Sequence, residues 1–239
     1  MYTEIIDALK SYASEEKASV LRRFFKTGPG EYGEGDTFIG VTVPHTRQVA
    51  NSFADARFDT IEKLLSNSIH EVRLCALLIL VRKYTLARRD ATQRKNIAEF
   101  YLTHTGSIDN WDLVDLSAPK ILGMWVRETG DTAILHRLSI SENMWEQRIA
   151  IVATMPLIKN GDTSTTIALA SRYLTHSHHL MHKATGWLLR EAGKKDLCAL
   201  LSFLDRHTPE MPRTALRYAI ERLTPEQRHH YMAIPRRRF

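Results

Sequence analysis

Apolar residues recur at every third or fourth position along nearly the whole chain, and this period constrains the fold more than any other feature. Typical runs are Val72, Cys75, Ala76, Ile79 and Trp145, Ile149, Val152. Such a spacing places the apolar side chains on one face of a helix. Residues 37–43 alone show a trace of strand alternation, and that segment is too short to found a sheet. The sequence therefore predicts an all-α fold.

Five apolar segments align as a weak internal repeat, with steps of about 30 to 42 residues between them. They are residues 70–80, 110–122, 144–155, 182–190 and 212–223. Steps of this length are typical of HEAT-like helical hairpins, which stack into a solenoid, an α-α superhelix whose inner helices line a concave groove. We expect residues 1–239 to form a single HEAT-like repeat domain, with an Arg-rich tail at residues 235–239.

Local signals add expectations about helix ends and cellular compartment. Thr208-Pro209 and Thr224-Pro225 are predicted to begin helices, because Thr can cap a helix and Pro fits its first turn. Cys75 and Cys198 both lie in apolar runs and are predicted to be buried, unpaired thiols of a reducing compartment. The N-terminal residues do not resemble a signal peptide, and no run approaches the ~20 apolar residues of a membrane span, so we expect a cytoplasmic protein.

The positive charge of the chain is concentrated in its C-terminal part. Residues 1–139 hold 18 basic and 18 acidic side chains, whereas residues 140–239 hold 15 basic and 9 acidic ones together with seven of the eleven histidines. This asymmetry favours a polyanion such as nucleic acid as the partner, with a generally basic surface as the alternative.

One position near the start of each repeated segment carries a charged residue. It is basic in four segments, at Arg73, Arg148, Lys183 and Arg213, and acidic in the fifth, at Asp115 with Asp112 beside it. A basic groove with one acid suits a polyanionic ligand handled by a single catalytic carboxylate. The alternative is that these are solvated charges on helix faces.

Two tryptophans share helix faces with these charged residues. Trp111 lies one turn before Asp115, and Trp187 shares a face with Lys183 and Arg190. An isolated Trp is usually a core residue, but the pairing with charged residues on successive inner helices favours a functional role. Pro119 cannot donate to the carbonyl of Asp115, so the helix is predicted to be interrupted there.

The histidines at 176, 178, 179 and 182 lie close together in the sequence, as the ligands of a metal site can. No carboxylate or Cys stands at ligand spacing beside them, so we expect no metal and no cofactor, and we expect these histidines to add to a basic rim.

The segments IDNWDLVDLSAPKILG, NMWEQRIAI and HKATGWLLREAGK closely resemble the AlkD-like alkylpurine DNA glycosylases, which are built from HEAT-like repeats, and FIGVTVPHTR resembles their N-terminal motif. The resemblance implies a concave DNA-binding groove and hydrolysis of the N-glycosidic bond of cationic 3-methyladenine and 7-methylguanine in double-stranded DNA. It also implies base excision repair without flipping of the base, in contrast to most glycosylases.

The resemblance assigns a role to individual residues. Asp115 matches the catalytic carboxylate, and Trp111 and Trp187 match the aromatic pair that flanks the lesion. Arg148 matches the phosphate-binding arginine, and Arg47 matches a basic position that faces DNA. Lys183 and Arg190 are predicted to contact the DNA backbone on the ground of helix face alone.

Some positions depart from the family pattern. Phe24 is the nearest match to a lesion-facing Tyr, Asn110 stands where relatives can carry an aromatic residue, and Thr42 stands where a longer amide is found. No lysine stands out as a Schiff-base nucleophile, so a monofunctional glycosylase is expected. The sequence shows no sign of oligomerisation, so a monomer is the default expectation. The alternative is a helical-repeat scaffold that binds damaged or branched DNA, or a protein partner, without catalysis.

Overall fold

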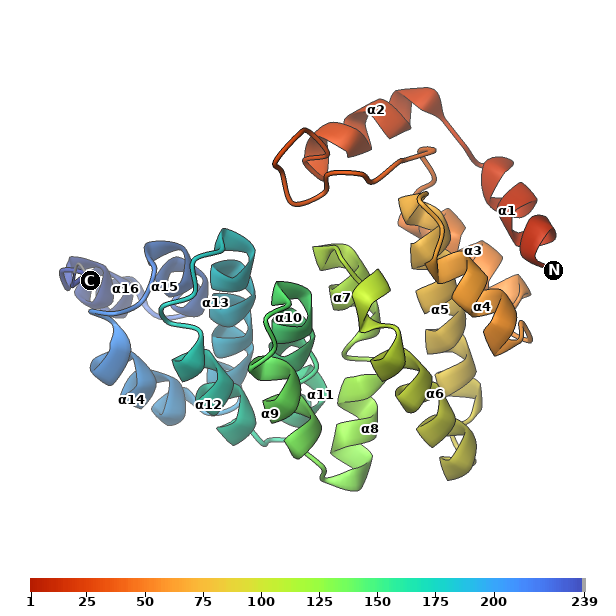
Figure 1. Ribbon diagram of the computed structural model, residues 1–239. Helices are drawn as coiled ribbons and strands as arrows, with labels where there is room; N and C mark the ends of the chain where they lie inside the picture. The colour runs from red at the N-terminus through yellow and green to blue at the C-terminus, as the bar shows by residue number, and fades with distance from the viewer. Residues whose placement is uncertain (238–239) are drawn as a thin grey trace. The chain divides into compact units, whose positions relative to one another are not determined.

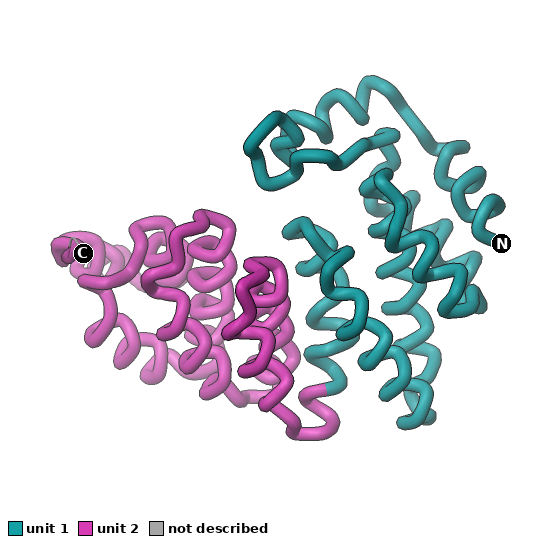
Figure 2. Tube along the Cα trace, in the orientation of Figure 1, with its two compact units in different colours: residues 1–125 teal, residues 126–239 magenta. Residues whose placement is uncertain are grey.

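The computed structural model describes residues 1–237 and is built from helices (Figure 1). Within these residues, the one β-type pairing is an isolated bridge between Thr37 and Ile69. The all-α prediction is therefore confirmed. The chain divides into two compact units, residues 1–125 and 126–239, and each is described by itself (Figure 2). The prediction of a single domain is not tested by this division.

Unit 1 is organised around the long helix α5, whose residues 70–81 are all buried. A helix that is buried on every side lies in the core of its unit. Helices α3, α4, α6 and α7 pack against it. The helices of this unit are α1 (Tyr2–Lys10), α2 (Glu15–Phe24), α3 (Val43–Ser52), α4 (Phe58–Leu65), α5 (His70–Leu86), α6 (Ala91–Thr103), η1 (Thr105–Ser107) and α7 (Trp111–Ser117), and α8 (Leu122–Thr129) crosses the boundary at residue 125.

Unit 2 has α13 at its centre, which packs against α10, α12, α14 and, most extensively, α15. A Cβ at Gly186 would lie 2.3 Å from the carbonyl oxygen of Ala215, so α13 and α15 approach closely because this residue has no side chain. The helices of this unit are α9 (Ala133–Ser139), α10 (Met144–Val152), α11 (Met155–Lys159), α12 (Ser164–Arg172), α13 (His179–Gly193), α14 (Leu197–His207), α15 (Arg213–Ala219) and α16 (Pro225–Ala233).

The five repeated segments of the sequence fall on α5, α7, α10, α13 and α15. The predicted start of a helix at Thr224 is also confirmed, because Thr224 and Gln227 form a reciprocal capping box at the beginning of α16. At Thr208 the prediction is wrong. This residue ends α14, where its hydroxyl donates to the carbonyl of Leu204, and the next helix begins only at Arg213, after Pro212.

The two cysteines differ in their surroundings. Cys75 is buried in α5, as predicted, and burial raises the pKa of its thiol to about 12. Cys198 is exposed, which contradicts the prediction, because it occupies the first turn of α14 on the side away from the core residues Leu200 and Phe203. In the described part of the chain, no helix is long and apolar enough to cross a membrane.

The FIGVTVPHTR segment begins as extended chain beside the start of α2. Gly40 has a positive φ of 81°, and a Cβ there would lie 2.0 Å from the carbonyl oxygen of Ser14. The backbone N–H groups of Ile39, Gly40 and Val41 all donate to the buried carboxylate of Glu71, at 2.8 to 3.2 Å. A carboxylate that accepts three backbone hydrogen bonds is well satisfied inside a protein, so α5 fixes this segment in place.

Candidate functional site

Helix α7 carries the two residues of unit 1 that the sequence analysis placed at the centre of the chemistry. Trp111 is its first residue, and Asp115 follows one turn later. Asn110 caps the helix by accepting from the backbone N–H of Trp111 at 2.8 Å. The helix ends at Ser117, two residues before Pro119, so the predicted interruption is present. Both Trp111 and Asp115 are half-buried.

Aromatic side chains surround Trp111. Its indole stacks on Phe25, with ring centroids 5.2 Å apart and planes inclined by 11°. Phe24, at the end of α2, meets the indole edge-on at 5.8 Å and is 61% exposed. Phe24 therefore lies beside Trp111, with most of its ring open to solvent. This arrangement presents an aromatic surface of the kind that stacks on a nucleobase.

The side chain of Tyr101, on α6, contacts α7 near Asp115 through Ser117, the last residue of α7. The hydroxyl groups of Tyr101 and Ser117 are 3.0 Å apart, and Ser117 also donates to the carbonyl of Leu113. Burial raises the pKa of the Tyr101 phenol, and the negative charge of Asp115 raises it further, although the hydrogen bond with Ser117 lowers it. Tyr101 therefore stays a neutral phenol, and its hydroxyl and that of Ser117 are hydrogen-bonded to each other at the contact with α7.

His70 lies between two buried carboxylates. Its Nδ1 is 3.0 Å from Asp36 Oδ2, and its Nε2 is 2.9 Å from Asp112 Oδ2. Burial by itself lowers the pKa of His70, but the carboxylates of Asp112 and Asp36 outweigh it and raise the pKa to about 9. At neutral pH this side chain is therefore an imidazolium that joins the loop before residue 37 to α7.

Arg73 belongs to the same cluster. Its guanidinium pairs with Asp36 and, at 3.1 Å, with Asp109, and it donates to the carbonyl of Asn67 at 3.1 Å. Burial raises the pKa of Asp36, yet His70 and Arg73 together hold it below its usual value. Because Arg73 is only 5% exposed and both of its terminal nitrogens are bonded to these partners, with only Nε left without a partner, the expectation that it lines a groove as a free cation is wrong.

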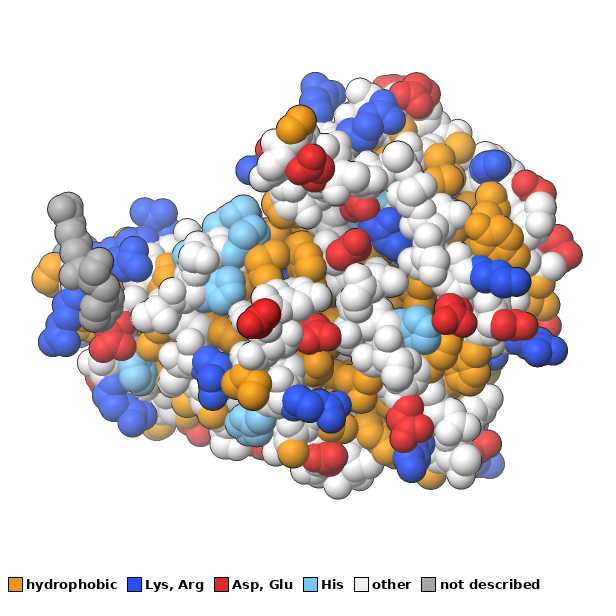
Figure 3. All heavy atoms as spheres, in the orientation of Figure 1, with side chains coloured by type: hydrophobic (Ala, Val, Ile, Leu, Met, Phe, Trp, Pro, Cys, Tyr) orange, Lys and Arg blue, Asp and Glu red, His pale blue; other side chains and the backbone are white. Residues whose placement is uncertain are grey.

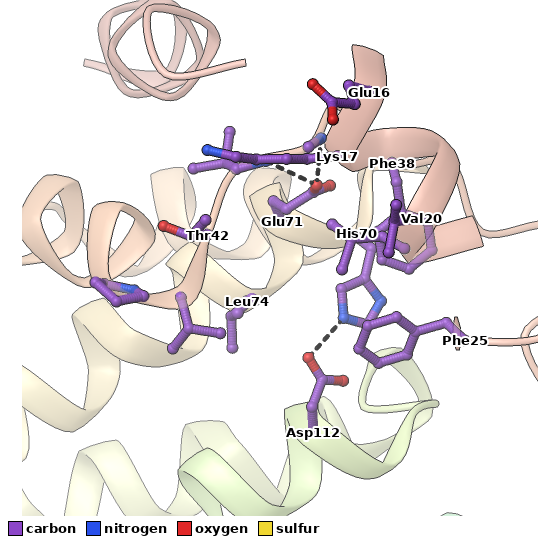
Figure 4. A pocket seen from close by; sticks show the side chains of 15 residues that line it. Glu16, Lys17, Val20, Phe25, Phe38, Thr42, His70, Glu71, Leu74 and Asp112 are labelled. Atoms are coloured by element: carbon purple, nitrogen blue, oxygen red, sulfur yellow. Dashed lines mark hydrogen bonds and ion pairs between the residues drawn. The ribbon is translucent and has the colours of Figure 1, made fainter. Parts of the chain in front are cut away.

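A pocket of about 410 Å³ opens beside this cluster, within unit 1. His70 and Asp112 face each other at its inner end, and Glu71 lies on its wall (Figure 4). The remaining wall is mostly apolar, with Phe25, Phe38 and Leu74 among its residues. Thr42, one of the positions that departs from the family pattern, also lines the pocket.

Arg148 of unit 2 lies on α10 and is 4% exposed. Its Nη1 donates to the carbonyl of Leu180, in the first turn of α13, at 2.6 Å. This hydrogen bond ties α10 to the beginning of α13. Arg213 plays a similar part further along, because it donates to the carbonyls of Met232 and Ile234.

Trp187 and its predicted neighbours lie on α13. Trp187 is half-buried, and Lys183, one turn earlier, is exposed. Arg190 is engaged in ion pairs with Glu221 and, at 3.1 Å, with Glu191, so a phosphate would compete with two carboxylates for it. Lys183 is therefore more accessible to an anionic ligand than Arg190. In unit 1, Arg47 is half-buried on α3, one turn beyond the extended segment.

Four histidines of unit 2, at 176, 178, 179 and 182, lie in the connection between α12 and α13 and in the first turn of α13, and pale blue histidine side chains gather on this part of the face drawn in Figure 3. Burial, followed by the charges of His179 and His176, lowers the pKa of His178 to about 4. Burial and the neighbouring His182 also lower the pKa of His176. At neutral pH these two histidines are uncharged, so the expectation that they add to a basic rim is wrong for them. Across residues 1–237, no three His, Cys, Asp or Glu side chains are arranged to hold a metal ion.

The sequence analysis missed His70, Asp36 and Phe25. Phe25 is adjacent to the predicted Phe24, but its stacking on Trp111 depends on the turn that follows α2. Asp36 and His70 are 34 residues apart, and His70 and Asp112 are 42 apart. The spacing of side chains along a helix identifies neighbours that are three or four residues apart, so it cannot identify pairs that are this distant in the sequence. A charged residue at the start of an otherwise apolar run, as in HEVRLCALLIL, was the one available signal.

These features define an all-α repeat protein with an aromatic and acidic site at the start of an inner helix. A sequence model of the DNA alkylation repair enzyme family matches residues 5–223, and the chain belongs to that family. The fold is similar to that of a structure described as a predicted DNA alkylation repair enzyme from Enterococcus faecalis, with a TM-score of 0.71 and 16% identity over 89% of this chain and 97% of that chain. No curated protein matches the chain.

The family assignment confirms the resemblance found in the sequence, and the similar structure confirms the helical-repeat fold. Membership in this family indicates a role in the repair of alkylated DNA, with DNA as the binding partner.

Proposed function

We propose that this protein is a monofunctional DNA glycosylase that hydrolyses the N-glycosidic bond of cationic alkylated purines, 3-methyladenine and 7-methylguanine, in double-stranded DNA. It acts as a monomer, leaves an abasic site for base excision repair, and does not flip the base. The observation that carries this proposal is the start of α7, where Trp111 is held against Phe25 and Phe24 and Asp115 follows one turn later.

The chemistry asked of Asp115 is electrostatic. An N-alkylated purine already bears a positive charge, so it leaves without a general acid, and positive charge develops on the deoxyribose as an oxocarbenium-like species. A carboxylate fixed beside the sugar stabilises that charge and orients the attacking water. Trp111 binds the cationic sugar and base through its indole face, a contact of about 0.5 to 2 kcal/mol.

The other roles follow the family resemblance residue by residue. Phe24 supplies a further aromatic face towards the lesion, which its exposure supports. In unit 2, Trp187 is the second lesion-flanking aromatic residue. Arg148 matches the phosphate-binding arginine, a role for which a planar guanidinium is well suited, but it is 4% exposed and donates to the carbonyl of Leu180, so it must leave this partner to bind a phosphate. Lys183 and Arg47 bind the DNA backbone. Arg190 contributes least, because Glu221 and Glu191 already neutralise it.

The test is single-turnover release of 7-methylguanine from a duplex by the unaltered protein and by Asp115→Asn. The amide keeps the size of the side chain and removes its charge, so release should slow by about 100-fold while DNA affinity changes little. Asp7→Asn, which neutralises an exposed carboxylate on α1, is the matched control and should retain full activity. Equal rates for Asp115→Asn and the unaltered protein would exclude the mechanism.

The absence of base flipping has its own readout. A 2-aminopurine placed beside the lesion becomes more fluorescent when its stacking neighbour leaves the helix. The proposal predicts no such increase when the protein binds the duplex. A large increase would show that the lesion is extruded from the helix.

A further inference from the structure

Buried polar side chains connect α5 to both residues that flank Trp111. On one side, Asp112 accepts from His70. On the other, Asn110 donates to Asp36 Oδ2 at 3.1 Å and accepts from the backbone N–H of Trp111. Asp36 Oδ2 also contacts His70 Nδ1, so the two arms meet at one carboxylate. Side-chain exposure is 2% for His70, 9% for Asp36 and 7% for Asp112.

The geometry specifies the charge state of His70. Each ring nitrogen lies within 3.0 Å of a carboxylate oxygen. A neutral imidazole has one nitrogen without a hydrogen. That nitrogen and the carboxylate oxygen beside it would both be acceptors, and no hydrogen bond could form between them. The imidazolium donates to both carboxylates. Phe38 and Phe25 cover the ring at centroid distances of 4.7 and 4.9 Å, where aromatic rings favour a cation.

We propose that His70 is a positioning residue, whose imidazolium, held between Asp36 and Asp112, fixes the first turn of α7 and thereby the orientation of Trp111 and Asp115. The proposal rests on the proposed function only for its catalytic consequence. His70 itself lies beneath the aromatic residues and has no role in touching DNA.

The consequence for catalysis follows from where the imidazolium acts. When it loses its proton, one of the two carboxylates loses its donor: either Asp112, which belongs to the first turn of α7, or Asp36, to which Asn110 donates. Either loss removes one of the hydrogen bonds that fix the turn that carries Trp111. Asp115 lies one turn further along the same short helix, so its carboxylate moves with that turn. A misplacement of about 1 Å in a catalytic group can cost about 100-fold in rate. We expect removal of the imidazolium to slow base release by at least about 10-fold.

Other charged groups surround His70, and they must be distinguished from it. Asp36 and Asp112 contact its ring, and Arg73 pairs with Asp36 and with Asp109. The pocket beside it also contains Glu71, Glu16 and Lys17. Carboxyl and guanidinium groups ordinarily titrate well outside the range from about pH 7 to about pH 9.5. A transition inside that range, seen at the His70 ring, therefore reports the imidazolium.

The experiment uses the whole protein labelled with 5-fluorotryptophan and with ¹⁵N-histidine. The Trp111 ¹⁹F resonance is assigned with Trp111→Phe and the His70 ring signals with His70→Asn. In a titration of the unaltered protein, the Trp111 resonance should shift with the same midpoint as the His70 ring. A Trp111 resonance that stays constant while His70 titrates would overturn the proposal, as would a His70 ring that is already neutral at about pH 7.

Single-turnover base release supplies the second arm. His70→Asn should be at least about 10-fold slower than the unaltered protein, with DNA affinity within about 3-fold. The control is His104→Asn, which removes a histidine that pairs with Glu62 and stacks on Phe100 and should keep the normal rate. A folded His70→Asn protein with the normal rate overturns the proposal. If the unaltered protein releases no base, the proposed function fails, and the NMR titration alone decides whether His70 positions Trp111.

Discussion

At the scale of single residues, the stability of unit 1 depends on a cluster of buried charged side chains, Asp36, His70, Arg73 and Asp112. Two carboxylates and two cations lie together in the core and pair with one another, and Arg73 Nε is the one buried nitrogen of these cations without a partner. A buried charge left without its partner costs about 3 to 5 kcal/mol. The cluster is therefore stable as a set and vulnerable to the loss of any one member.

The stability of the protein should depend on pH through His70. Its pKa is raised from 6.5 to about 9 in the folded state, so the folded protein holds a proton that the unfolded chain has lost within that window. The free energy of unfolding should therefore fall as the pH rises from about 6.5 to about 9. Urea denaturation at several pH values measures this. His70→Asn should lack the decline, and His104→Asn should keep it. A decline of equal size in His70→Asn would mean that another group causes it.

The contacts of these residues could not be predicted from the sequence of any one helix. Trp111 and Asp115 could be paired from the sequence because they are one turn apart. The repeat predicts that Arg73 is a groove residue because its place matches that of Lys183, yet Arg73 pairs in the core with Asp36 and Asp109, from loops far along the chain. The register of the repeat predicts which helix a residue belongs to. Its tertiary partners decide whether its charge is paired in the core or exposed to a ligand.

At the scale of helices, α13, which carries Trp187, approaches α15 closely at Gly186. Gly186→Ala would place a methyl group 2.3 Å from the carbonyl oxygen of Ala215 and force the helices apart. We expect a loss of about 1 to 3 kcal/mol in the free energy of unfolding.

Thermal or urea denaturation measures the effect of Gly186→Ala. Gly106→Ala is the matched control, because a Cβ there meets nothing within 4 Å and its stability should be unchanged. A Gly186→Ala protein as stable as this control would show that the α13–α15 packing can adjust.

Most helices were predictable because their apolar period and their caps are local properties of the sequence. The capping box at Thr224 and Gln227 needs four residues and is present in the structure. Thr208-Pro209 carries a similar signal, but its Thr hydroxyl donates back into α14, so the same residues end a helix there. Local patterns of this kind are ambiguous wherever a helix end and a helix start lie a few residues apart.

At the scale of the whole molecule, the excess of positive charge in residues 140–239 should govern affinity for DNA. The logarithm of the affinity for an undamaged duplex should fall linearly with the logarithm of the salt concentration. Lys183→Gln should reduce the magnitude of this slope by about 1, the value for the loss of one phosphate contact. Lys159→Gln, which removes an exposed charge on α11, should leave the slope unchanged. Titrations by fluorescence anisotropy measure both slopes. Equal slopes for all three proteins would remove Lys183 from the DNA contacts.

The family and the helical-repeat fold could be predicted from the sequence because three central motifs stand in the family order. The cluster around His70 could not, because it is assembled from residues 34 to 42 positions apart. Family membership establishes a role in the repair of alkylated DNA. The catalytic roles of Asp115, Trp111 and Trp187 go beyond that assignment and are proposals.

The most direct test of the central claim is the detection of free base by mass spectrometry after incubation of the unaltered protein with a methylated duplex. The proposed glycosylase releases 7-methylguanine and 3-methyladenine faster than the spontaneous rate and leaves abasic sites in uncut strands. Binding to the same duplex with no release above the spontaneous rate would contradict the claim and would favour a helical-repeat protein that binds DNA without catalysis.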